Sequence, residues 1–238
     1  MGRLKCLSSG SDGNSYIIEC GGEKLLIELG ITWRRILKGL DFDLSGVVGA
    51  LCSHRHADHS KSITDAIKAC IDVYSCLDVQ TIHPKVKVLE KGRKTQIGGF
   101  RVQPIPLFHS VECIGFLIEH TNMGRLLFCT DTTKIPYNFK DVHHVLVEGN
   151  SDVETMIDNA CDDIFSRSNS ANHMDFNDTI DFLRRNYSKE LQNVVLLHLS
   201  NVNSNERMYM ERTQSALGFN NVYIADSGLE LELINSEF

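Results

Sequence analysis

The sequence predicts an α/β protein in which helices cover β-sheets. Its first half contains short apolar segments separated by Gly, Asn, Asp and Ser turns, a pattern typical of strands. Its second half mixes such segments with stretches of helical spacing, and this order fits sheets that helices cover. Because no repeat, low-complexity segment or linker-like tract divides the 238 residues, we expect one domain over 1–238.

The predicted elements follow from the period of the apolar residues. Strands are predicted at 3–9, 15–20, 24–29, 47–54, 72–76, 100–110, 113–120, 125–131, 143–149, 193–200 and 222–233. Helices are predicted at 31–40, 60–70, 77–85, 152–165, 176–187 and 205–217, and a polar loop at 166–175. The segment GSDGN (10–14) precedes a strand and not a helix, so we interpret it as a hairpin turn that closes over a cleft, and not as a phosphate loop.

The cysteines indicate free thiols in a reducing compartment. No CxxC pair occurs, and most of the cysteines lie in apolar stretches, as small buried hydrophobic residues do. They are Cys6, Cys20, Cys52, Cys70, Cys76, Cys113, Cys129 and Cys161. Since the sequence shows neither a signal peptide nor an apolar run long enough to span a membrane, we expect a soluble, cytoplasmic protein.

The charge balance argues against a broad nucleic-acid-binding face. Lys and Arg number 24 and Asp and Glu 31, giving a net charge of −7, and the densest basic group is KGRK at 91–94. Proteins that neutralise many phosphates carry a basic face. A small substrate therefore fits the composition better than a long polyanion.

The segment VVGALCSHRHADHS (47–60) carries the strongest chemical signal. A predicted buried strand runs directly into His54, His56, Asp58 and His59. Imidazole and carboxylate groups are ligands for zinc, manganese or iron, and so many of them in six positions favours a metal site over a solvated loop.

Three other predicted strands end on a single residue that can bind metal. They are PIPLFHS with His109, RLLFCTD with Asp131 and NVVLLHLS with His198. The junction of a strand with a loop is the usual place for functional side chains. The sequence therefore predicts that these strand ends meet the histidine cluster.

These motifs resemble those of the metallo-β-lactamase superfamily, whose HxHxDH signature matches HRHADH. The resemblance implies a four-layer αββα sandwich and two divalent metal ions, zinc first and manganese as the alternative. His54, His56 and His109 would hold one ion, and Asp58, His59 and His198 the other, with Asp131 between them. Four further histidines, His83, His120, His143 and His144, have no ligand-type neighbours at useful spacing, and we interpret them as structural.

The segment CLSSGSDGNSYIIE resembles the N-terminus of the YycJ/WalJ proteins, relatives of the tRNase Z phosphodiesterases. Two residues depart from that pattern, because Glu28 stands where Asp is usual and Met174 follows His173. The resemblance makes Asp58, His173 and Glu148 the catalytic residues, with His173 protonating the departing oxygen and Glu148 supporting it. An imidazole beside a carboxylate suits general acid catalysis near neutral pH.

The chain has room for neither the tRNase Z arm nor the inserted domain of the β-CASP nucleases. It also resembles the phage-type anti-Pycsar enzymes, so the leading hypothesis is hydrolysis of 3′,5′-cyclic nucleotides to 5′-monophosphates by a homodimer, in the host cytoplasm if a phage encodes it. A YycJ/WalJ-like DNA or RNA nuclease is the first alternative. A glyoxalase II-type thioester hydrolase is the second, although it would not need Glu148 and His173 as an acid pair.

Overall fold

The computed structural model describes residues 1–149, 173–197 and 206–235, and its strands form two mixed sheets of seven strands each. The first sheet has the order β14 (Glu230–Leu233), β1 (Gly2–Ser8), β2 (Ser15–Cys20), β3 (Glu23–Ile27), β4 (Val47–Leu51), β5 (Val73–Ser75) and β6 (Lys87–Val88). The second has the order β13 (Val222–Ile224), β12 (Asn193–Leu197), β11 (His144–Glu148), β10 (Gly124–Cys129), β9 (Cys113–His120), β8 (Phe100–Leu107) and β7 (Thr95–Ile97).

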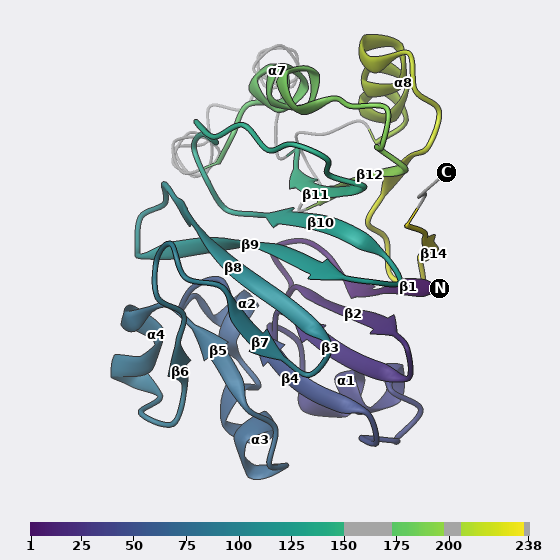
Figure 1. Cartoon of the computed structure of the whole chain (residues 1–238). Helices are drawn as coiled ribbons and strands as arrows, with labels where there is room; N and C mark the ends of the chain where they lie inside the picture. The colour runs from purple at the N-terminus through teal and green to yellow at the C-terminus, as the bar shows by residue number, and fades with distance from the viewer. Residues whose placement is uncertain (150–172, 198–205, 236–238) are drawn as a thin grey trace.

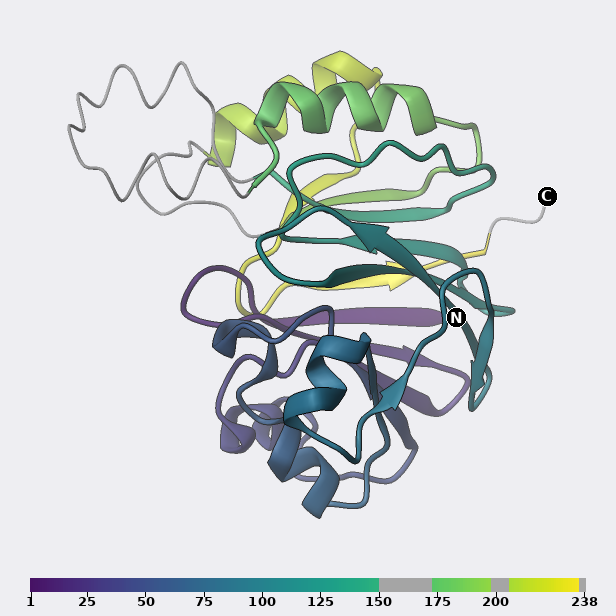
Figure 2. The same cartoon turned by 90° about the vertical axis from the view of Figure 1, so that its left-hand side faces the viewer.

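Helices cover the outer face of each sheet, and the two sheets pack against each other (Figures 1 and 2). The first sheet carries α1 (Trp33–Gly39), α2 (Ala57–Ser60), α3 (Ile63–Lys68) and α4 (Leu77–Ile82), and the second carries α7 (Phe176–Asn186) and α8 (Glu206–Leu217). Figure 2 shows the resulting layers in the order helix, sheet, sheet, helix. The predicted four-layer αββα sandwich is confirmed.

Aromatic side chains join the layers. Between the sheets, Tyr16 of β2 meets Phe128 of β10 edge to face, with ring centroids 5.5 Å apart. Within the helical layer that covers the second sheet, Phe176 of α7 stacks on Tyr209 of α8, with ring centroids 3.9 Å apart. All four side chains are essentially buried, and aromatic pairs of this kind stabilise a core beyond the effect of buried area alone.

The strand directions gather several chain segments at one edge of the sandwich. In the first sheet β3, β4, β5 and β6 run parallel, and in the second β10, β11, β12 and β13 do. The carboxyl ends of parallel strands lie at the same edge, so the segments that follow β4, β10 and β11 emerge together. These segments carry His54, Asp131 and Glu148.

The predicted strand at 222–233 is wrong as a single element. Its first part is β13 in the second sheet and its last part is β14 in the first, with a turn between them in which Gly228 has φ 96°. The predicted helix at 60–70 forms as the shorter α3, whereas the short helix α2 before it and the short edge strands β6 and β7 were not predicted. The predicted helix at 152–165 and most of the predicted loop at 166–175 lie outside the described residues.

The cysteines in the described ranges are free, as predicted. Six of these seven are buried and Cys70 is exposed, whereas Cys161 lies outside the ranges. No helix within 1–149, 173–197 or 206–235 is long and apolar enough to cross a membrane.

His144 is a buried histidine held in its neutral form. Its Nε2 lies 3.1 Å from the Met123 carbonyl oxygen, and its Nδ1 lies 3.0 Å from the Asn193 amide nitrogen. In the neutral ring, Nε2–H donates to the Met123 carbonyl oxygen and Nδ1 accepts from the Asn193 amide. Burial is the largest cause that lowers the pKa of His144, to about 4.

We expect this histidine to make stability depend on pH. Its pKa is lower in the folded chain than the ordinary value of 6.5, so its contribution is complete above pH 6.5 and is lost as pH falls towards 4. The free energy of unfolding should fall by up to about 3 kcal/mol over that window. Urea unfolding of His144→Gln should show a weaker dependence, while a His83→Gln control should retain most of it. An equal slope in His144→Gln and the native chain would contradict the assignment.

Candidate metal centre

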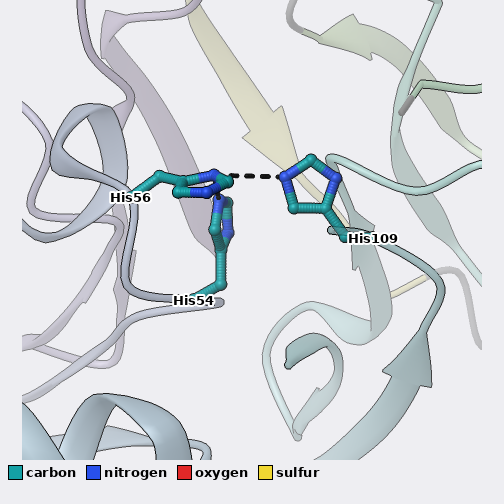
Figure 3. Close-up of side chains that lie close together, drawn as sticks. All are labelled: His54, His56 and His109. Carbon is teal, nitrogen blue, oxygen red and sulfur yellow. Dashed lines mark hydrogen bonds between the residues drawn. The ribbon is translucent and has the colours of Figure 1, made fainter. Parts of the chain in front are cut away.

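The loop after β4 and the loop after β8 bring three imidazoles together. His54 Nε2 lies 3.0 Å from His56 Nδ1, and His109 Nε2 lies 3.2 Å from that same Nδ1 (Figure 3). Figure 3 shows the three rings pointing towards one another from two separate segments. Their nitrogen atoms lie within 4.8 Å of one another, so the three can act as ligands of a single ion.

A second group shares His54 and adds His59 and Asp131. Asp131 follows β10, and its two oxygens face different histidines: Oδ1 lies 3.5 Å from His59 Nε2, and Oδ2 lies 3.8 Å from His54 Nε2. Asp58 Oδ2 lies 3.3 Å from His59 Nε2. Asp131 therefore lies between the two histidine groups, the position that the sequence predicts for a shared ligand.

The buried carboxyl group of Glu28 contacts the segment after β4 that carries the histidines. Both of its oxygens lie 3.2 Å from the backbone nitrogen of Ser53, and Oε2 lies 3.5 Å from His59 Nδ1. Glu28 is fully buried and has a left-handed backbone, with φ 62°. Strain of this kind is kept where the surroundings fix the residue, so Glu28 orients the ring of His59 and the chain that enters the loop.

The turn between β1 and β2 closes against the same loop. Asn14 N donates to the Asp58 carbonyl oxygen at 2.8 Å, and Asn14 Nδ2 lies 3.1 Å from His59 Nε2. Gly30 allows this approach, because a Cβ atom there would lie 1.6 Å from the Asp58 carbonyl oxygen. The hairpin turn predicted at GSDGN therefore forms and contacts the candidate site.

A third group joins Asp131 to Glu148 and His173. His173 Nδ1 lies 2.8 Å from Glu148 Oε2, and Thr132 N donates to Glu148 Oε1 at 2.6 Å. Glu148 is fully buried at the end of β11, and the rings of His173 and His109 are 5.7 Å apart. An imidazole hydrogen-bonded to a buried carboxyl group is an arrangement suited to handling a proton.

His173 is held in place by the start of α7. The Asp175 side chain accepts from Asn177 N at 2.8 Å and caps the helix. Thr179, one turn further on, donates to the Glu148 carbonyl oxygen at 2.9 Å. The helix is thus bonded to the end of β11, and His173 faces the strand ends.

The electrostatics of the site favour a cation. Burial lowers the pKa of His54 well below its ordinary value, and His59 lowers it further, so His54 is neutral, as a metal ligand must be. Burial also lowers the pKa of His59, but Asp131 and Glu28 raise it by more, and the net pKa is well above the ordinary value. The negative charge that favours a proton on His59 also favours a cation beside it.

The structure brings most of the predicted site residues together. His54, His56, His59, His109 and Asp131 belong to groups able to hold metal, Asp58 lies beside His59, and Glu148 pairs with His173. His198 lies outside the described residues. Within the described ranges, the four histidines interpreted as structural belong to none of these groups.

Some residues of the site were not predicted. Sequence reasoning noted Glu28 only as a departure from a family pattern, and it gave no role to Asn14 or Thr132. Their contacts join segments far apart in the chain. A buried acidic residue at the end of an apolar strand was the one local signal that could have identified Glu28.

A large surface cavity of about 1030 Å³ lies at the opposite ends of β8, β9 and β10. It is lined by basic residues that are already paired: Lys94 Nζ and Arg101 Nε lie 2.9 and 2.7 Å from the Glu119 carboxylate. None of the candidate metal ligands lines it. The basic group predicted at 91–94 is therefore in part a salt-bridge network remote from the candidate centre.

Removing a shared ligand should remove metal. Asp131 lies close to histidines of both groups, so after loading with zinc Asp131→Ala should retain far less metal per chain than the native protein, and His54→Ala should also retain less. Elemental analysis after dialysis against a weak chelator measures this. His120→Ala is the matched control and should keep its metal; full metal content in Asp131→Ala would overturn the ligand assignment.

Comparison with known proteins agrees with this geometry. The family model of the metallo-β-lactamase superfamily matches residues 9–157. The exodeoxyribonuclease YycJ of Bacillus anthracis is 26% identical over 167 residues, which are 63% of this chain and 63% of that protein. The anti-Pycsar protein Apyc1 of Paenibacillus xerothermodurans is 38% identical over 52 residues, 22% of this chain and 21% of that protein.

Among solved structures, the metallo-β-lactamase fold protein YhfI of Bacillus subtilis superposes with a TM-score of 0.72. It is 16% identical, and the match covers 97% of this chain and 98% of that one, which shows a shared fold. The family match spans more than half of the chain and includes His54, His56, Asp58, His59, His109 and Asp131. The chain therefore belongs to the metallo-β-lactamase superfamily, a superfamily of hydrolases, and its relatives include a nuclease.

Proposed function

We propose that the protein is a metal-dependent phosphodiesterase that hydrolyses 3′,5′-cyclic nucleotides to 5′-monophosphates. The observation that carries the phosphodiester class is the 2.8 Å contact between His173 Nδ1 and Glu148, next to the groups able to hold metal. A leaving alkoxide needs a proton, and this pair can supply one. The similarity of the chain to an exodeoxyribonuclease and to an anti-Pycsar protein supports the same class of bond.

His173 acts as the general acid in this proposal. With Nδ1–H donating to Glu148, its Nε2 is the atom that carries the transferable proton. Burial lowers the pKa of His173, but the hydrogen bond and charge of Glu148 raise it by more, so the net pKa is raised. The protonated form needed for donation is thereby favoured near neutral pH.

The proposed metal ligands are His54, His56 and His109 for one ion and Asp58, His59 and His198 for the other, with Asp131 shared. Divalent ions bound there would supply Lewis acidity and lower the pKa of a water molecule. The chain itself orients these ligands through Glu28 and Asn14 and keeps the rings of His54 and His59 away from solvent. Zinc is the first choice for a site with this many imidazoles, and manganese the second.

The net negative charge of the chain favours a small substrate over a nucleic-acid polymer. The chain carries a net charge of −7. Lys94 of the densest basic segment and Arg101 of β8 are both paired with Glu119, far from the candidate centre. A nuclease remains the second candidate, because the match to the exodeoxyribonuclease is longer than the match to the anti-Pycsar protein. The proposal includes a cytoplasmic homodimer, which light scattering of the purified chain would test.

The substrate assay separates the two candidates. Zinc- or manganese-loaded protein should convert 3′,5′-cyclic mononucleotides to 5′-monophosphates, and Asp58→Ala should not. Degradation of linear DNA or RNA with intact cyclic nucleotides would assign the protein to the nuclease candidate, in which case the rate should fall steeply with salt. Hydrolysis of thioesters in place of all phosphodiesters would overturn the proposal.

Removal of His173 tests the acid role separately. His173→Ala should lower kcat on a cyclic nucleotide by about 10²- to 10⁴-fold while bound metal is unchanged. On a p-nitrophenyl phosphodiester the loss should be far smaller, because that leaving group needs no proton. Equal losses on both substrates, or loss of metal, would show that His173 is structural.

A further inference from the structure

An exposed aromatic side chain adjoins a proposed metal ligand in the chain. Phe108 directly precedes His109, and 42% of its surface is open to solvent. Lys134 Nζ lies over its ring, 4.7 Å from the ring centroid. Lys134 is three residues after Asp131, so an exposed ring and an exposed ammonium group flank two of the proposed ligands.

The backbone around this pair is fixed, although the side chains are exposed. Phe108 N donates to Thr132 Oγ1 at 3.0 Å, and Thr133 N donates to the Phe108 carbonyl oxygen at 2.8 Å. Thr132 also donates from Oγ1 to the Lys134 carbonyl oxygen at 2.9 Å and from its backbone nitrogen to Glu148. The buried Thr132 therefore links Phe108 and Lys134 to the proposed acid pair.

Neither exposed side chain is explained by the core or by the proposed chemistry. Leaving a phenyl ring in water forgoes the gain of burial, and Phe108 is not used to hold metal or to move a proton. An exposed aromatic ring beside a phosphodiester site is suited to a nucleobase, because every base has a flat face that stacks on an aromatic ring. The attraction between Lys134 and the ring restricts the motion of the ring.

We propose that the ring of Phe108 is the platform on which the nucleobase of the substrate stacks, and that Lys134 is a positioning residue that holds this ring. The inference rests on the proposed function, because only a nucleotide brings a base to the centre. It adds a site for the base, which the metal ligands and the acid pair do not provide. Stacking is tolerant of base identity, so purine and pyrimidine nucleotides should both use the platform.

Equilibrium binding of two small probes tests the platform without catalysis. AMP and ribose 5-phosphate differ in the presence of the base, and their affinities for the zinc-loaded full chain can be measured by calorimetry. The native protein should bind AMP more tightly by about 5- to 150-fold. Phe108→Leu should bring this ratio close to one with little effect on ribose 5-phosphate, and Phe108→Trp should keep it.

Two further variants sharpen the test. Lys134→Met should lower the ratio of the AMP affinity to the ribose 5-phosphate affinity part of the way, and Lys134→Arg should keep the native ratio. Any attraction between the Lys134 charge and the phosphate acts on both probes and therefore cancels from the ratio. Phe42→Leu is the matched control, since Phe42 is 66% exposed but lies before β4, at the end of that strand remote from His54.

The outcomes separate this inference from the proposed function. A ratio near one in the native protein, or a ratio that Phe108→Leu leaves unchanged, would overturn the platform even if cyclic nucleotides are hydrolysed. A ratio that depends on Phe108 would support it even if no phosphodiester is cleaved, and in that case the proposed activity would be wrong and the base site would stand.

Discussion

The burial of three carboxyl groups at one sheet edge is the constraint on which the rest of the site depends. Glu28, Asp131 and Glu148 expose 0%, 3% and 0% of their surface. A buried charge is costly unless hydrogen-bond donors or cations surround it. Glu28 therefore meets Ser53 N and His59, and Glu148 meets Thr132 N and His173. Asp131 meets three histidines. The fold of the sandwich brings these partners to the same sheet edge.

This constraint divides the roles of the histidines. His54, His56, His59 and His109 lie in groups able to hold metal. His173 belongs to a third such group, but its Nδ1 also contacts Glu148, whose second oxygen accepts from Thr132 N. The proposed function assigns metal binding to the first set of histidines and proton delivery to His173.

Much of the fold and the centre of the site could be predicted from the sequence. The HRHADH loop, His109 and Asp131 follow apolar strands, and parallel strands place such ends together. The helix after His173 followed from the spacing of its apolar residues, and the pairing of Glu148 with His173 followed from a family resemblance. Contacts between distant segments, such as those of Asn14 and Thr132, leave no local period in the sequence. The segment 222–233 was misassigned because its apolar pattern continues across a turn that only sheet pairing reveals.

The segment 222–233 crosses from the second sheet to the first, and this crossing affects folding during synthesis. β14 completes the first sheet by pairing with β1, and Arg3 of β1 lies 3.3 Å from Glu230 across more than two hundred residues of sequence. During synthesis, the edge of β1 stays open until β14 has left the ribosome. Pairings this far apart form late, and an unpaired edge can bind another chain. Until β14 is made, the edge of β1 is therefore a place where incomplete chains of this protein can pair with one another.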